Sequence, residues 1–136
     1  LVKSPKLYFV DTGLACRLLG IANPEQLFLH PNRGNLFESF IVAEMLKTRL
    51  NAGDSPDLYF WRDNTGNEVD VVYEDGPVLR AVEIKSGKTF SPDFASGLDT
   101  WMRFSGAMPE ACSIVYSGDR ELSLRGISVR GWNRLP

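Results

Sequence analysis

The pattern of apolar and polar positions divides the chain into short segments of two kinds. Apolar residues recur at helical spacing over about 36–50 and again over 93–105. Other stretches have the length and the β-branched or aromatic composition of strands, and Asp75-Gly76 predicts a tight turn between two of them. The predicted strands cover 58–62, 68–73, 78–85, 112–116 and 127–129.

The first thirty-odd residues give a weaker pattern. Residues 6–11 predict a short strand, 14–20 a short helix closed by Gly20, and 24–34 a connector. Ser91-Pro92 predicts the beginning of the second long helix, with the serine as cap, and Gly106 predicts its end. The order is therefore helix, three-strand meander, helix, strand, which predicts one α/β domain with a central mixed sheet.

Charged residues stand inside the apolar segment 80–87. Glu83 and Lys85 are two positions apart, so a strand projects both side chains from one face. Val82 and Ile84 project from the opposite face, which indicates a central strand with one buried side. A carboxylate and an ammonium held together at a strand end are typical of a metal site with a lysine that acts on water.

Further carboxylates accompany this pair. Asp70 lies between two valines in the predicted strand 68–73, although aspartate is a poor strand former, and Glu68 shares its face. Glu38 lies on the apolar face of the helix at 36–50, where a buried carboxylate needs a partner such as a metal ion. Glu38, Glu68, Asp70 and Glu83 therefore predict one acidic site.

The chemistry of phosphodiester hydrolysis explains these residue types. Asp70 and Glu83 would offer hard oxygen ligands to Mg²⁺ or Mn²⁺, and the Ile84 carbonyl is a further candidate ligand. Glu38 would bind through water or hold a second ion. Lys85 would orient and deprotonate the attacking water, or stabilise the developing charge.

Each residue also has a structural interpretation. Asn35 and Glu38 have the spacing of a helix capping box. Asp70 would then be an edge aspartate paired with an arginine, and Glu83 with Lys85 a solvent-facing ion pair.

The composition indicates the class of protein but does not indicate a binding partner. The chain has 136 residues, 43% hydrophobic and 24% charged, and a net charge of −2, which predicts a soluble globular domain with a cytoplasmic address by default. No apolar stretch approaches the roughly 20 residues that cross a bilayer. Ser86-Gly-Lys-Thr89 resembles the end of a phosphate-binding loop, but Val82 stands where that motif needs glycine.

Five blocks of sequence resemble a known family. They are KSPKLYFVDTGL at 3–14, GNLFE at 34–38, YFWR at 59–62, NEVD at 67–70 and VEIKSG at 82–87. Together they resemble the C-terminal domain of unknown function that follows an AAA+ ATPase module in many prokaryotic proteins. The order of elements also resembles the restriction-endonuclease-like fold of the PD-(D/E)xK phosphodiesterase superfamily.

The resemblance carries expectations about organisation and activity. It implies that residues 1–30 are the tail of a preceding domain and a connector, and that 31–136 form the nuclease-like domain. It implies a magnesium-dependent nuclease acting on DNA, with Glu38, Asp70, Glu83 and Lys85 as catalytic residues. The alternative is an inactive adaptor of the same fold, which binds nucleic acid or a protein partner and regulates the ATPase.

Overall fold

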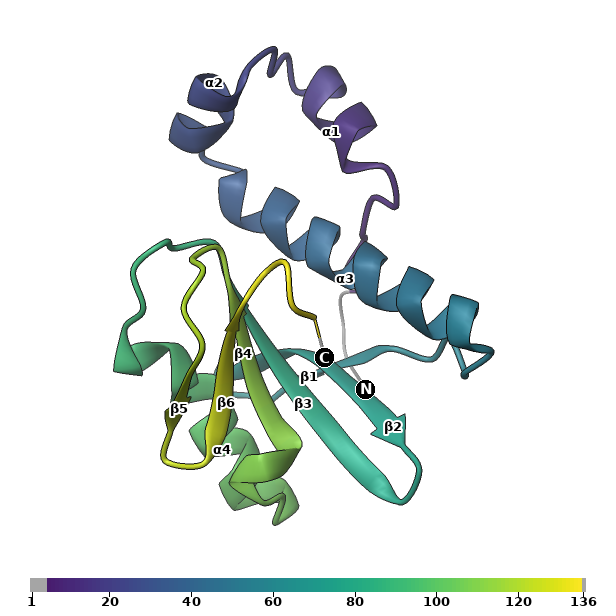
Figure 1. Ribbon diagram of the computed structural model, residues 1–136, viewed down its shortest axis with the longest axis vertical. Helices are drawn as coiled ribbons and strands as arrows, with labels where there is room; N and C mark the ends of the chain where they lie inside the picture. Colours follow the sequence, from purple (N-terminus) through teal and green to yellow (C-terminus); the bar gives the residue numbers. More distant parts are fainter. Residues whose placement is uncertain (1–4, 136) are drawn as a thin grey trace.

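A six-stranded mixed sheet forms the centre of the computed structural model, which describes residues 5–135 (Figure 1). The strands are β1 (Tyr59–Arg62), β2 (Glu68–Asp75), β3 (Val78–Lys85), β4 (Cys112–Tyr116), β5 (Leu122–Leu124) and β6 (Ile127–Gly131). The helices are α1 (Thr12–Leu18), α2 (Pro24–Leu29), α3 (Arg33–Ala52) and α4 (Ser96–Ser105).

Both pairing modes occur in the sheet, whose spatial order is β1-β2-β3-β4-β6-β5. The meander β1-β2-β3 is antiparallel, β3, β4 and β6 run parallel, and β5 returns antiparallel to β6. Gly76 makes the predicted turn between β2 and β3 with a φ of 57°, a conformation that glycine adopts without strain. The parallel step from β3 to β4 needs a crossover, which α4 supplies.

The two faces of the sheet have separate cores. On one face α3 contributes Ile41, Val42 and Met45, which pack on Val82 and Ile84 of β3. On the other face α4 packs on residues of β2, β3, β4 and β6. The side chains of β3 alternate between the two cores as predicted, because successive residues of a strand point to opposite sides.

The N-terminal segment packs on α3 and departs from prediction. Residues 6–11 are extended but are not a strand, and the connector predicted at 24–34 contains α2. The side chains of Asp11 and Asn23 accept backbone N–H bonds at the beginnings of α1 and α2, which is why each short helix begins there. Ile21 and Ala15 are buried against Leu36 of α3.

The remaining boundaries agree closely with the sequence patterns. Helix α3 begins at Arg33 and is longer than predicted, while Gly106 ends α4 with a φ of 74°, as predicted. The helix expected at Ser91 starts as a 3₁₀ turn, Pro92–Ala95, without a side-chain cap bond. Strand β5 was not predicted. No helix within residues 5–135 has both the length and the apolarity to cross a membrane.

Candidate functional site

A local irregularity of β2 places Asp70 at the centre of the site. Tyr59 pairs with Val72 and Trp61 with Val69, so β2 has one residue more than β1 over this interval, which is a β-bulge. Val69 and Val72 accordingly both face the α4 core. Such a bulge re-aims a side chain and ends regular pairing.

Asp70 fills the gap that opens beside the bulge. Regular pairing between β2 and β3 ends at Val71 and Val82. The next N–H of β3 that points toward β2 is that of Ile84, two residues further on, and it donates to Oδ2 of Asp70 at 2.9 Å. The carboxylate therefore holds the divergent ends of two strands together, and its other oxygen faces the acidic cluster.

Three carboxylates converge beside this point. One oxygen each from Glu38, Glu68 and Asp70 lie within 4.8 Å of one another. Glu38 comes from the second turn of α3, whereas Glu68 and Asp70 flank Val69 on β2. Like charges at this separation repel one another, so the arrangement requires a cation.

The cation is the ammonium of Lys6, from the N-terminal segment. Its Nζ lies 2.8 Å from Oε1 of Glu38 and 3.2 Å from Oδ1 of Asp70, and it also pairs with Glu68. The Lys6 side chain is 15% exposed. Burial lowers the pKa of Lys6, but the hydrogen bonds with Glu38 and Glu68 and the charge of Asp70 raise it by more, so the ammonium keeps its proton.

Two further groups complete the contacts of these acids. The hydroxyl of Tyr8 donates to Oε1 of Glu38 at 2.8 Å, and Arg62 donates to Oε2 of Glu68 at 2.6 Å. Burial raises the pKa of Glu68, but the hydrogen bonds from Lys6 and Arg62 lower it by more. Glu68 is therefore firmly ionised in the folded protein.

Glu83 and Lys85 form an ion pair on β3, with 2.5 Å between Nζ and Oε1. The pair is asymmetric, because the Glu83 side chain is 6% exposed and that of Lys85 36%. Oε2 of Glu83 is buried and has no hydrogen-bond partner among residues 5–135. Burial, followed by the charge of Asp70, raises the pKa of Glu83 to about 7.

The pKa of Asp70 is raised as well. Burial raises its pKa, the charge of Glu38 adds to this, and the N–H of Ile84 with the two lysines opposes it. Within residues 5–135 the site holds four carboxylates and three cationic side chains, Lys6, Lys85 and Arg62. When all four carboxylates are ionised, one negative charge is not offset, and this donor set of hard oxygens fits a divalent cation such as Mg²⁺ or Mn²⁺.

Helix α4 closes the site from the other side of the sheet. A Cβ on Gly97 would collide with the backbone oxygen of Glu68 and would lie 3.2 Å from Oε2 of Glu83. Glycine at this position lets α4 approach β2 and β3 closely. This approach is what buries Glu83.

All the predicted acids lie around Asp70, but their structural interpretations need correction. Helix α3 begins at Arg33, so Asn35 is inside the helix, and Glu38 contacts Lys6 and Tyr8 instead of forming a capping box. The partner of Asp70 is a lysine and not an arginine. Glu83 does pair with Lys85, but from a buried position. The catalytic and metal-binding roles of Glu38, Asp70, Glu83, Ile84 and Lys85 stay predictions.

The sequence patterns missed Lys6, Tyr8 and Arg62 as contacts of the acids. Lys6 and Tyr8 belong to the KSPKLYFVDTGL block, in which they alternate with apolar Leu7 and Phe9. That alternation predicts two faces, of which the polar one faces the acids, whereas Leu7 is 86% exposed. Nothing in the spacing indicates which distant residues the polar face meets.

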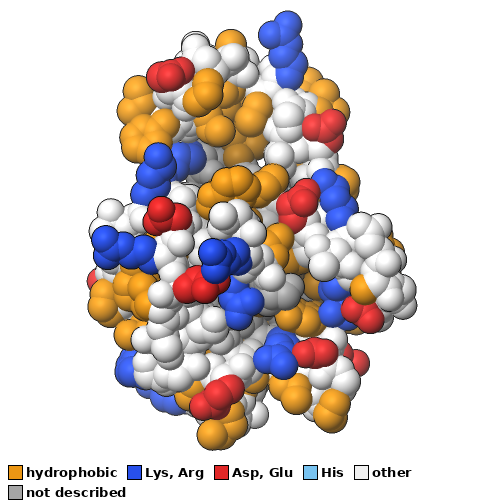
Figure 2. All heavy atoms as spheres, viewed as in Figure 1, with side chains coloured by type: hydrophobic (Ala, Val, Ile, Leu, Met, Phe, Trp, Pro, Cys, Tyr) orange, Lys and Arg blue, Asp and Glu red, His pale blue; other side chains and the backbone are white. Residues whose placement is uncertain are grey.

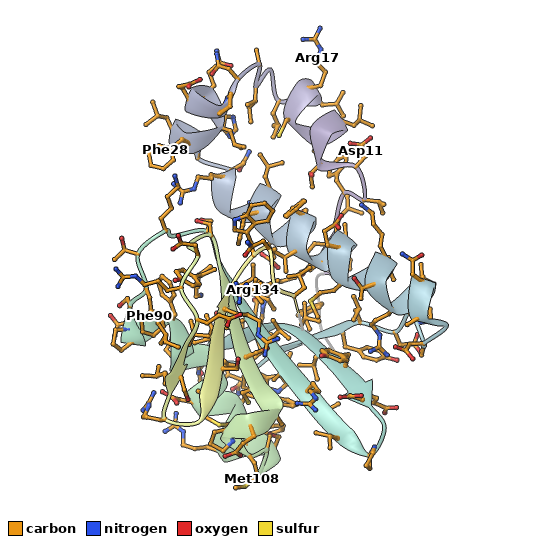
Figure 3. The ribbon with its side chains drawn as sticks, in the orientation of Figure 1. Asp11, Arg17, Phe28, Phe90, Met108 and Arg134 are labelled. Carbon is orange, nitrogen blue, oxygen red and sulfur yellow. The ribbon has the colours of Figure 1, made fainter. Side chains whose placement is uncertain are left out.

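An apolar cavity of about 380 Å³ lies beside the first two turns of α3. Its walls include Leu27 and Phe28 of α2, Phe37 and Phe40 of α3, and Trp132 after β6. Figure 3 shows Phe28 projecting from α2 beside the beginning of α3, and Figure 2 shows apolar side chains gathered on this end of the molecule. The cavity is separate from the acids, although Phe37 is the neighbour of Glu38 in sequence.

Comparison with known proteins identifies the class. Residues 33–134 match the family described as "Domain of unknown function (DUF4143)", and the chain belongs to that family. It is also 38% identical over 87 residues to two uncharacterized proteins, Rv2008c of Mycobacterium tuberculosis and Mb2031c of Mycobacterium bovis. The match covers 64% of this chain and 19% of each relative, so the chain spans about a fifth of their length. No solved structure matches the chain.

Proposed function

We propose that this domain is a divalent-metal-dependent phosphodiesterase that acts on DNA. The observation that carries the proposal is the convergence of Glu38, Glu68 and Asp70 within 4.8 Å, next to the Glu83–Lys85 pair. A structural ion pair needs one acid and one base. Among residues 5–135 the site has more acids than cations, and Oε2 of Glu83 is buried there without a hydrogen-bond partner.

Asp70 and Glu83 are the proposed ligands of Mg²⁺ or Mn²⁺, with the Ile84 carbonyl and with Glu38 acting directly or through water. A bound ion would supply Lewis acidity at a non-bridging phosphate oxygen. Asp70 suits the role because its N–H bond from Ile84 fixes the carboxylate against rotation. Glu83 suits it because burial, followed by the charge of Asp70, raises its pKa, and an incoming cation would offset the repulsion from Asp70.

Lys85 is the proposed residue for the attacking water. It is the more exposed member of its pair, so solvent and a phosphate reach it, while Glu83 fixes its position. Burial lowers the pKa of Lys85, but Glu83 raises it by more, so in this state the ammonium is a hydrogen-bond donor that orients water and stabilises negative charge. Accepting a proton from water would first require loss of its own.

The proposal extends to the fold and to the whole protein. The meander β1-β2-β3, the parallel step to β4 and the acids at the divergent strand ends support a restriction-endonuclease-like domain of the PD-(D/E)xK superfamily. The relatives are about five times longer than the matched part, which leaves room for the proposed AAA+ ATPase module.

A second candidate function is an inactive adaptor of the same fold. The observation that favours it is the ammonium of Lys6 among the acids, because an internal cation satisfies three carboxylates without any metal. The exposed apolar residues of α1 and α2, such as Leu18 and Phe28, suit contact with a protein partner.

Cleavage assays distinguish the two functions. The domain and its full-length parent, the latter with ATP, are incubated with Mg²⁺ or Mn²⁺ and with duplex, single-stranded, flapped and branched DNA. The phosphodiesterase is expected to cut at least one substrate, and Lys85→Ala is expected to lower the rate by about 10²-fold or more while DNA binding survives. Arg134→Ala, which removes an exposed cation paired with Glu121, is the matched control.

Two outcomes contradict the proposal. If the parent binds these DNAs but cuts none, the adaptor function replaces the nuclease. If Lys85→Ala cuts as fast as the unchanged protein, the cleavage comes from another site or from a contaminant.

A further inference from the structure

Segment 5–10, which precedes α1, places two side chains in the acidic cluster and is not part of the sheet. Its residues are in no helix or strand. Its polar side chains face inward, where Lys6 contacts three acids and Tyr8 contacts one. Its apolar side chains face outward, with Leu7 at 86%, Val10 at 62% and Phe9 at 42% exposure. The segment is thus held to the domain mainly by the contacts of Lys6 and Tyr8.

From these contacts we infer that Lys6 is a removable cation: its ammonium occupies the place of a divalent ion among Glu38, Glu68 and Asp70, so metal binding there requires displacement of segment 5–10. The inference rests on the proposed function for the purpose of the site, but it concerns how access to the site is controlled. An ammonium and a divalent ion cannot both lie within bonding distance of the same three oxygens.

The second observation is the buried Glu83. Its Oε2 has no hydrogen-bond partner among residues 5–135, and its carboxylate is repelled by that of Asp70, which Lys6 contacts directly. Lys6 and Lys85 together therefore leave one buried acid oxygen of the site unsatisfied. A divalent ion carries twice the charge and binds more oxygens, so exchanging Lys6 for such an ion improves the balance of the cluster.

The lysine side chain leaves the acids as an ammonium ion, because its Nζ lies in ion-pair contact with three carboxylates. The segment can leave without breaking a strand ladder, because residues 5–10 belong to none.

The first test is metal affinity. Mn²⁺ binding is measured by calorimetry and by electron paramagnetic resonance for the unchanged chain, for Lys6→Met and for Lys47→Met. Lys47 lies on α3, pairs with Glu44 and is 50% exposed, so its variant has the same change in net charge outside the site. Lys6→Met is expected to bind Mn²⁺ about 10-fold or more tightly than the other two chains.

The second test needs no variant and covers the case in which Lys6→Met fails to fold. Trypsin must take a lysine side chain into its specificity pocket, so it cuts after Lys6 only when the ammonium has left the acids. Mn²⁺ is expected to accelerate cleavage between Lys6 and Leu7. Cleavage after Lys88, an exposed residue of the loop beyond β3, is the internal control and is expected not to change.

Each outcome bears on the inference separately from catalysis. Equal Mn²⁺ affinity of Lys6→Met and Lys47→Met overturns it, and so does the absence of Mn²⁺ binding in a folded Lys6→Met chain. Cleavage after Lys6 at the same rate with and without Mn²⁺ also overturns it. If Lys6→Met gains affinity for Mn²⁺ but neither it nor the parent cuts DNA, the inference stands and the nuclease function falls.

Discussion

Oδ2 of Asp70 accepts the backbone N–H of Ile84 at 2.9 Å, and this bond joins β2 to β3 where their ladder ends. The carboxylate of Asp70 accepts an N–H that a backbone carbonyl would accept in a regular ladder. The consequence is that the acid most central to the site is also part of the connection between two central strands. Its substitution therefore has to be interpreted for stability as well as for function.

The metal site is tested by thermal unfolding of the Asp70→Ala variant. Mg²⁺ or Mn²⁺ is expected to raise the Tm of the unchanged chain, because a ligand that binds only the folded state stabilises it, by about 2.7 kcal/mol at about 100 times its Kd. Asp70→Ala is expected to lose most of that shift. The control is Asp93→Ala, which removes an exposed aspartate beyond β3. An equal shift in all three chains at matched ionic strength would place the ion elsewhere.

The raised pKa of Glu83 predicts that the free energy of unfolding falls as the pH rises from about 5 to about 7. The pKa of Glu83 is about 7 in the folded protein and 4.5 for an ordinary glutamate, so in this interval the folded state binds the extra proton. Stability falls with pH where the folded state holds more protons. Glu83→Gln is expected to flatten this part of the profile, by on the order of 2 kcal/mol.

The measurement is urea unfolding at pH 5, 6, 7 and 8 for the unchanged chain, Glu83→Gln and Glu110→Gln. Glu110 is an exposed glutamate outside the site, so its variant is expected to keep the slope of the unchanged chain. A slope that persists in Glu83→Gln would assign the proton to another group. Asp70 is the first candidate, because burial also raises its pKa.

Gly97 is expected to tolerate no side chain. Alanine there would meet the backbone oxygen of Glu68 and the carboxylate of Glu83, and relieving that overlap costs about 1–3 kcal/mol. Gly34 is the matched control, since it lies in α3 and a Cβ there would meet only Oγ of Ser86, at 3.9 Å. Gly34→Ala is expected to be neutral or stabilising. Chemical denaturation of both variants checks the prediction, which fails if Gly97→Ala is as stable as Gly34→Ala.

Tyr8 is expected to stabilise the inward position of its segment. Tyr8→Phe removes the hydroxyl that donates to Glu38 at 2.8 Å and keeps the ring, so it should cost about 0.5–1.5 kcal/mol. Tyr59→Phe is the control, because Tyr59 is 61% exposed at the edge strand. Denaturation curves for both variants supply the comparison. Equal stability of the two would mean that the Tyr8 hydroxyl bond adds nothing.

Local patterns determined most of the fold. Helical spacing, strand alternation and the turns at Gly76 and Gly106 predicted α3, α4 and five of the six strands near their observed places, because these signals act within a few residues. The mixed α/β sheet with flanking helices follows from that order of elements. Strand β5 escaped prediction because three residues, Leu122–Leu124, are too few to show a period.

The sequence by itself also selected the acids, because Asp70 and Glu83 are polar residues in otherwise apolar strands. Only the tertiary structure decided what surrounds them. Lys6 lies 32 positions from Glu38 and 64 from Asp70, and the bulge that turns Asp70 toward Ile84 appears only in the pairing with β1. Contacts of this kind depend on where the chain returns in space, and the spacing of residues along the chain carries no record of that.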